Sequence, residues 1–239
     1  MAKKAIMSDA MFTVVRAPFG RWVLYRELIF NLTGVQADPA IIELIYKKER
    51  QAAESKGQVA FLKSGDYRRH WGAINANLLR QLDPSISQLE AQEIGEQIFS
   101  EVMFNPTNYL LQHELEDFIL AAREKDYALY LATNQEVAGI KRILEYFQIR
   151  PYFKNIFVSD VIGFKKPDPR FFEHCIKATK CSPGHIAFLG NNPRNDMEGA
   201  AAGGISHRFL FDPDGEHLDT ECAVSYIQIR SLLELFSHF

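Results

Sequence analysis

The sequence predicts an α/β protein whose mostly parallel sheet is interrupted by an inserted block of helices. In the second half of the chain, short apolar runs alternate with segments of helical periodicity, a pattern typical of parallel strands joined by crossover helices. An isolated apolar run at residues 5–9 fits the same sheet, whereas residues 21–104 show helical periodicity and no convincing strand. We therefore expect a core domain of residues 1–15 and 106–239 and a helical domain of residues 16–105.

The composition is that of an ordinary globular protein, with 239 residues, 47% of them hydrophobic and 24% charged. The net charge of −3 gives no indication of binding to nucleic acid or to anionic membranes. No apolar run approaches the length of a membrane-spanning helix or resembles a signal peptide. The three cysteines, Cys175, Cys181 and Cys222, lack metal-binding spacing and suit a reducing compartment. We expect a soluble, cytoplasmic protein.

The first predicted strand ends in a single carboxylate, Asp9, and the helical block begins after the turn residues Pro18 and Gly20. Four helices in succession are expected to pack as a small bundle, with a loop between Gly57 and Gly65. The signals for these helices are an apolar stripe from Trp22 to Leu32 before Gly34, an Asp38-Pro39 start, an apolar stripe from Tyr67 to Leu82 after Asp66, and a Ser87-Gln88-Leu89-Glu90 capping box.

The remaining elements of the core follow from the same periodicity and from short turn segments between them. A final helix is expected after Ser231, which can cap it. The expected helices are residues 112–125, 136–146, 170–179 and 194–202, and the expected strands are residues 127–132, 156–161, 185–189 and 206–211.

Polar side chains follow four of the predicted strands, at the point where each strand ends. Because the carboxyl ends of parallel strands meet at one edge of a sheet, these side chains are expected to face one crevice. A carboxylate held there can attack an electrophile and form a covalent ester. A lysine and a hydroxyl beside helix starts can hold an anion such as phosphate. The residues concerned are Asp9, Thr13, Thr133, Asn134, Lys166, Asn191 and Asp196.

The run Lys-Pro-Asp-Pro-Arg-Phe-Phe at residues 166–172, and Gly190 followed by Asn195-Asp196 and Gly199-Ala200, carry a family resemblance. The chain resembles the haloacid dehalogenase superfamily, in the subfamily with a helical C1-type cap inserted after the first motif. The resemblance implies a Rossmann-like core and a hydrolase, most similar to phosphatases, that acts on a small phosphorylated metabolite.

The resemblance also implies a role for each of the candidate site residues. It implies that Asp9 is the nucleophile, that Thr133 and Lys166 also serve catalysis, and that Asn134, Thr133 and Lys166 bind the substrate. Magnesium would be held by Asp9, the backbone carbonyl of Met11, Asn191 and Asp196.

Two of the family motifs are degenerate. Family phosphatases carry Asp-x-Asp-Gly-Thr, whereas residues 9–13 read Asp-Ala-Met-Phe-Thr. The thioether of Met11 cannot transfer a proton, so turnover as a phosphatase is expected to be slow. The family's fourth motif usually begins Gly-Asp, and here it is Gly190-Asn191. Because Asn191 offers only a neutral carbonyl oxygen, magnesium binding is expected to be weak or absent.

Two other functions remain open from the sequence. The Asp-Ala-Met start and the pair Asn191-Asn192 are similar to motifs of the metal-independent 2-haloacid dehalogenases, although the spacing from Gly190 to Asp196 is that of the phosphatases. The vacant acid position also fits a catalytically inactive protein that binds a metabolite or a protein partner. The sequence assigns neither the substrate nor the oligomeric state.

Overall fold

The computed structural model describes residues 4–55, 66–215 and 222–239. The chain forms two compact units, which we call the core unit (Met1–Arg16 and Leu111–Phe239) and the helical unit (Ala17–Leu110). The first boundary between the units lies one residue later than the sequence predicts, and the second boundary lies five residues later. The loop expected between Gly57 and Gly65 lies outside the described residues.

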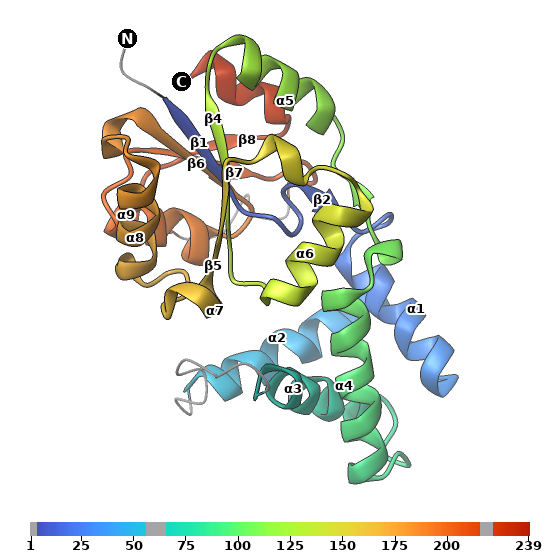
Figure 1. The fold of residues 1–239 in the computed structure, drawn as a ribbon. Helices are drawn as coiled ribbons and strands as arrows, with labels where there is room; N and C mark the ends of the chain where they lie inside the picture. The colour runs from blue at the N-terminus through green and yellow to red at the C-terminus, as the bar shows by residue number, and fades with distance from the viewer. Residues whose placement is uncertain (1–3, 56–65, 216–221) are drawn as a thin grey trace. The chain divides into compact units, whose positions relative to one another are not determined.

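The core unit is built on a six-stranded, wholly parallel sheet with the order β5-β4-β1-β6-β7-β8 (Figure 1). The first strand of the chain is therefore central, as expected for an α/β fold whose second half supplies the flanking strands. The strands are β1 (Ala5–Ser8), β4 (Ala128–Thr133), β5 (Asn155–Val158), β6 (Ile186–Gly190), β7 (His207–Phe211) and β8 (Ile227–Ile229).

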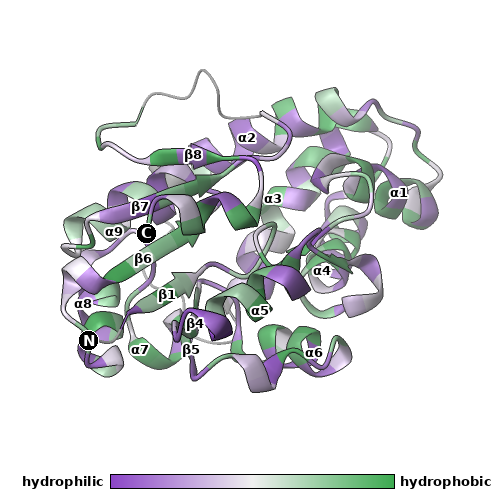
Figure 2. Cartoon of the chain, turned by 90° about the horizontal axis from the view of Figure 1, so that it is seen from above, coloured by the Kyte–Doolittle hydropathy of each residue, from purple (hydrophilic) through white to green (hydrophobic). Residues whose placement is uncertain are grey.

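Helices cover both faces of this sheet, with α8 (Pro169–Thr179) on one side and α5 (Leu115–Glu124) on the other. The inner strands β1, β4 and β6 are buried along their whole length. Such strands read as apolar runs, as β6 does in Figure 2. On the α8 side, the rings of Phe172 and Phe188 pack 5.2 Å apart between centroids. The other core helices are α6 (Val137–Tyr146), α7 (Ser159–Ile162) and α9 (Gly199–Ala202), with 3₁₀ turns at Arg150–Tyr152 and Pro183–His185.

The predicted strand at residues 156–161 is wrong beyond Val158. Ser159 and Asp160 interrupt the apolar run and begin the single turn α7, which ends at Gly163 in the left-handed region (φ +85°). The Gly163 N–H donates to the Ser159 carbonyl at 2.9 Å, so this glycine closes the turn as a helix C-cap.

Two predicted helices differ in kind from the observed elements. The expected helix 194–202 opens as a π-helical turn, Pro193–Glu198, before α9. The last helix is a 3₁₀ helix, Leu232–Ser237, that begins at a Ser231 capping box. Strand β8 was not predicted, because its three residues are too short to show a period. Two more two-residue strands, β2 (Val15–Arg16) and β3 (Leu110–Leu111), lie where the chain passes between the units.

The helical unit contains the four expected helices, α1 (Arg21–Thr33), α2 (Pro39–Ser55), α3 (Asp66–Leu82) and α4 (Gln88–Phe104), followed by a 3₁₀ turn at Pro106–Asn108. Their ends match the sequence signals, since Gly34 is a left-handed C-cap and the Ser87 hydroxyl accepts the Glu90 N–H. A β-carbon added at Gly95 would lie 2.3 Å from the Gly72 carbonyl, so α3 and α4 approach closely through small residues. Among the described residues, no helix combines the length and apolar character needed to cross a bilayer.

Candidate active site at the carboxyl edge of the sheet

The central strand places Asp9 at the carboxyl edge of the sheet. Ser8, the last residue of β1, pairs with Leu131 of β4 and Leu189 of β6. The Asp9 N–H donates to the Leu189 carbonyl at 2.8 Å, and the Ser8 hydroxyl donates to the Asp9 carbonyl at 2.7 Å. The backbone of Asp9 is thus held on both sides, and its largely buried side chain projects just beyond the strand.

Lys166 joins two carboxylates that come from opposite ends of the chain. Its Nζ atom lies 2.6 Å from Asp9 Oδ1 and 2.6 Å from Asp196 Oδ1, and its side chain is only 3% exposed. Burial by itself lowers the pKa of Lys166, but the Asp196 and Asp9 carboxylates outweigh it and raise that pKa above its usual value. The two carboxylates therefore favour the charged form of this buried lysine.

Asp196 is the most enclosed member of this group, with 1% of its surface exposed. Its second oxygen, Oδ2, accepts the Asn192 N–H at 2.9 Å, and the Asn192 side chain in turn accepts the Asn195 N–H at 2.8 Å. Burial raises the pKa of Asp196 to about 6, although the Lys166 ammonium and the Asn192 N–H oppose the shift. The π-helical turn thus places the Asp196 carboxylate against Lys166 and buries that carboxylate.

Gly190 leaves room for this aspartate. A β-carbon at Gly190 would lie 2.4 Å from Asp196 Oδ2. Gly190→Ala is expected to push the carboxylate out of position and to lower the free energy of unfolding by about 1–3 kcal/mol, as overpacking does. Urea unfolding measures this change. Gly184→Ala is the matched control, because nothing lies within 4 Å of its added carbon, and equal losses in both variants would contradict the prediction.

Asn134 makes two hydrogen bonds to the backbone of Lys166. Its side-chain nitrogen donates to the Lys166 carbonyl at 2.9 Å, and its side-chain oxygen accepts the Lys166 N–H at 2.8 Å. The sequence predicted Asn134 as a substrate-binding residue, and that role stays a prediction beside this observed one. The neighbouring Thr133 is buried, and its Oγ1 accepts the Gln135 N–H at 3.1 Å. The hydroxyl can still donate its own hydrogen.

The loop after Asp9 is a tight turn. The Ala10 carbonyl accepts the N–H groups of Val14 and Val15 at 2.9 and 3.2 Å. Phe12 lies in the left-handed region with φ +62°, which costs a residue with a β-carbon about 1–2 kcal/mol. Phe12 and Met11 are half-buried, whereas the Thr13 hydroxyl is buried without a hydrogen-bond partner among the described residues.

Few carboxylate oxygens at this edge are left for a magnesium ion. Mg²⁺ requires several hard oxygen ligands in near-octahedral geometry. Three of the four carboxylate oxygens of Asp9 and Asp196 already accept a hydrogen bond, leaving Asp9 Oδ2. Within residues 4–55, 66–215 and 222–239, no three His, Cys, Asp or Glu side chains group closely enough to hold a metal ion. Met11 and Asn191, the other predicted ligands, follow the neighbouring strands β1 and β6 and contribute at most neutral oxygens.

Asn192 was missed in the sequence as a site residue. It lies at the start of the π-helical turn, where its side chain and backbone hold Asn195 and Asp196. An asparagine directly before a proline is the signal that could have found it, because that pair commonly caps a helix.

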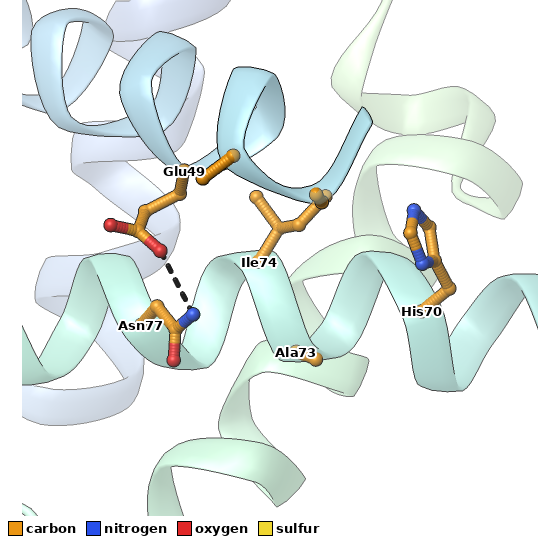
Figure 3. A pocket seen from close by; sticks show the side chains of 7 residues that line it. Glu49, His70, Ala73, Ile74 and Asn77 are labelled. Atoms are coloured by element: carbon orange, nitrogen blue, oxygen red, sulfur yellow. Dashed lines mark hydrogen bonds between the residues drawn. The ribbon is translucent and has the colours of Figure 1, made fainter. Parts of the chain in front are cut away.

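A separate pocket lies between α2 and α3 of the helical unit. Figure 3 shows Glu49 and Asn77 facing each other across it, with His70 further along α3. Asn77 donates to Glu49 at 2.9 Å, and Gln81 donates to the other Glu49 oxygen at 2.8 Å. The Glu49 carboxylate of this pocket thus accepts hydrogen bonds from two neighbouring amides.

The chain is similar to known proteins in sequence and in fold. Residues 28–204 match the family model for the haloacid dehalogenase-like hydrolases. The chain is 32% identical over 115 residues to the phosphoserine phosphatase of Thermus thermophilus, a match that covers 48% of this chain and 45% of that protein. The chain therefore spans about half the length of that relative.

The chain is also 25% identical over 190 residues to the glyceraldehyde 3-phosphate phosphatase of Methanothermobacter thermautotrophicus, covering 77% of this chain and 75% of that protein. Its fold superposes on that of the HAD-hydrolase YfnB from Bacillus subtilis bound to magnesium, with a TM-score of 0.74, 19% identity, and coverage of 100% of this chain and 99% of that one.

Proposed function

Because the chain belongs to the haloacid dehalogenase-like hydrolase family, we propose that it hydrolyses a small phosphorylated metabolite through a covalent intermediate on Asp9. The observation that carries the proposal is the buried Lys166 ammonium, 2.6 Å from both Asp9 and Asp196. It offsets the repulsion between the Asp9 carboxylate and an anionic substrate. The two phosphatases above, which are named for small phosphate esters, support the same substrate class.

Asp9 attacks with the oxygen that the protein leaves available. Oδ1 accepts a hydrogen bond from the Lys166 ammonium, whereas Oδ2 has no hydrogen-bond partner among the described residues. A bond forms between Oδ2 and phosphorus while the bond between phosphorus and the leaving oxygen breaks. The leaving oxygen takes a proton from water, and Asp9 becomes an acyl phosphate. The Thr133 hydroxyl, oriented by the Gln135 N–H, donates to a phosphoryl oxygen, and Lys166 neutralises the charge that develops there.

Asp196 acts as a positioning residue for Lys166. When Asp9 is esterified, its carboxylate no longer offers a negative charge to the ammonium. The 2.6 Å contact with Asp196 holds the ammonium in place through that stage. Water then attacks phosphorus, the Asp9 carboxylate leaves, and the proton of the water passes to phosphate and solvent.

Phosphate release from a panel of small phosphate esters, including phosphoserine and glyceraldehyde 3-phosphate, tests the proposal. We expect slow release above the Asp9→Asn background, and a phosphoryl group on the Asp9 peptide after acid quenching. No release above that background would contradict it. Ligand-induced thermal stabilisation without turnover would then indicate a binding protein, and halide release from 2-haloacids in the presence of chelator would indicate dehalogenation.

The same assay examines the metal. Three of the four carboxylate oxygens already accept a hydrogen bond. We therefore expect the rate of phosphate release in EDTA to lie within about twofold of the rate with added Mg²⁺. A rise of about tenfold or more with Mg²⁺ would contradict this reading of the donor set.

A further inference from the structure

The backbone of Lys166 is held by the side chain of Asn134. Lys166 lies in an irregular segment between α7, which ends at Ile162, and α8, which begins at Pro169. A residue in such a segment is not fixed by the regular hydrogen bonds of a helix or a strand. Both polar groups of the Lys166 backbone are nevertheless bonded, because the Asn134 side chain accepts the N–H at 2.8 Å and donates to the carbonyl at 2.9 Å.

Asn134 pairs with this backbone much as a neighbouring strand would. Its side-chain amide offers the same donor and acceptor as a peptide group, so it can bond to both polar groups of one residue. Asn134 directly follows Thr133, the last residue of the buried strand β4. The amide therefore ties a segment 32 positions further along the chain to the carboxyl edge of the sheet.

The ammonium of Lys166 has to lie between two carboxylates that follow different strands. Its Nζ atom is 2.6 Å from Oδ1 of both Asp9, after β1, and Asp196, after β6. A lysine side chain is long and flexible, so a displaced backbone would let the ammonium leave one carboxylate while it keeps the other. Misplacing a catalytic group by about 1 Å can lower a rate about 10²-fold.

We propose, on the basis of the function proposed above, that Asn134 is a positioning residue for Lys166 and acts on the reaction through that lysine. Its two hydrogen bonds fix the Lys166 backbone, and the fixed backbone keeps the ammonium between Asp9 and Asp196. Such a residue affects the rate at which bound substrate reacts, whereas a residue that only binds substrate affects KM. The proposed role is therefore separable from the substrate-binding role that the sequence predicts for Asn134.

Asn134→Ala removes the donor and the acceptor together. We expect kcat for the best phosphoryl substrate to fall by about 10²-fold, while KM changes by less than about threefold. Asn155→Ala is the matched control and is expected to retain full activity, because Asn155 is exposed at the amino end of β5. Full activity in Asn134→Ala, or a rise in KM with kcat unchanged, would overturn the inference.

Asn134→Asp gives a pH profile that a loss of packing would not give. A protonated carboxylic acid has a donor and an acceptor and can replace both bonds of the amide, whereas the ionised carboxylate has no donor for the Lys166 carbonyl. We expect kcat of this variant, relative to the unaltered protein at the same pH, to fall about tenfold or more between about pH 4 and about pH 8. A ratio independent of pH would overturn the inference, and this measurement decides if Asn134→Ala does not fold.

Acetylation of lysines by acetic anhydride, followed by peptide mass spectrometry, tests the same contact without turnover. A loosened ammonium gives up its proton more readily, so Asn134→Ala is expected to raise the acetylation rate of Lys166 about tenfold or more relative to Lys177. Lys177 is exposed on α8 and serves as the internal reference. An unchanged ratio of the two rates would overturn the inference. No phosphate release above Asp9→Asn in the unaltered protein would instead count against the proposed function, and acetylation would still decide whether Asn134 holds Lys166.

Discussion

Lys166→Met is expected to lower the free energy of unfolding by about 3–5 kcal/mol, because it leaves two buried carboxylates without their shared cation. Asp196 is 1% exposed and the Asp9 side chain 12% exposed, so water cannot replace the lost ammonium. Phosphate release is expected to fall to the Asp9→Asn background, since an anionic substrate would meet two unpaired negative charges. Urea unfolding and the phosphate assay measure the two effects.

A double variant separates the loss of charge from the loss of packing. Lys166→Met combined with Asp196→Asn removes one of the two stranded charges, so it is expected to regain part of the stability that Lys166→Met loses. Lys177→Met, at an exposed position of α8, is the control and is expected to change stability by less than about 0.5 kcal/mol. A Lys166→Met protein as stable as Lys177→Met would mean that the buried contacts do not hold the site.

Asp9→Asn is expected to reduce kcat/KM for the best phosphoryl substrate by about 10⁴-fold or more, as removal of a nucleophile does. The amide keeps the size of the side chain but cannot form the acyl phosphate, so the trapped phosphoenzyme is expected to disappear as well. Lys166 retains its 2.6 Å contact with Asp196, and the fold is therefore expected to persist, as circular dichroism would show.

Asp168→Asn is the matched control for this substitution. Asp168 caps α8 by accepting the Arg170 N–H at 3.0 Å, and asparagine caps helices about as well as aspartate. The control is expected to retain full activity. Residual phosphoenzyme in Asp9→Asn, or an equal loss of activity in both variants, would show that another residue is the nucleophile.

Much of the fold could be predicted from local patterns. The apolar runs in β4 and β6 are uninterrupted, and the capping signals at Asp38 and Ser87 mark helix starts that the structure contains. The errors fall where the local signal is short or mixed. Ser159 and Asp160 begin α7 where the end of a strand was expected, and three residues were too few to reveal β8.

The candidate site, like the fold, could be predicted only in part from local patterns of residues. By itself, the sequence determined that Asp9, Lys166 and Asp196 each follow an apolar run, because strand ends are visible in the alternation of apolar and polar segments. Only the tertiary structure decided that one ammonium joins both carboxylates and that the Asn134 amide bonds to the Lys166 backbone. Asp9 and Lys166 are 157 positions apart in the chain. A contact of 2.6 Å between such distant residues depends on how the strands align in the sheet, and no local pattern of residues carries that information.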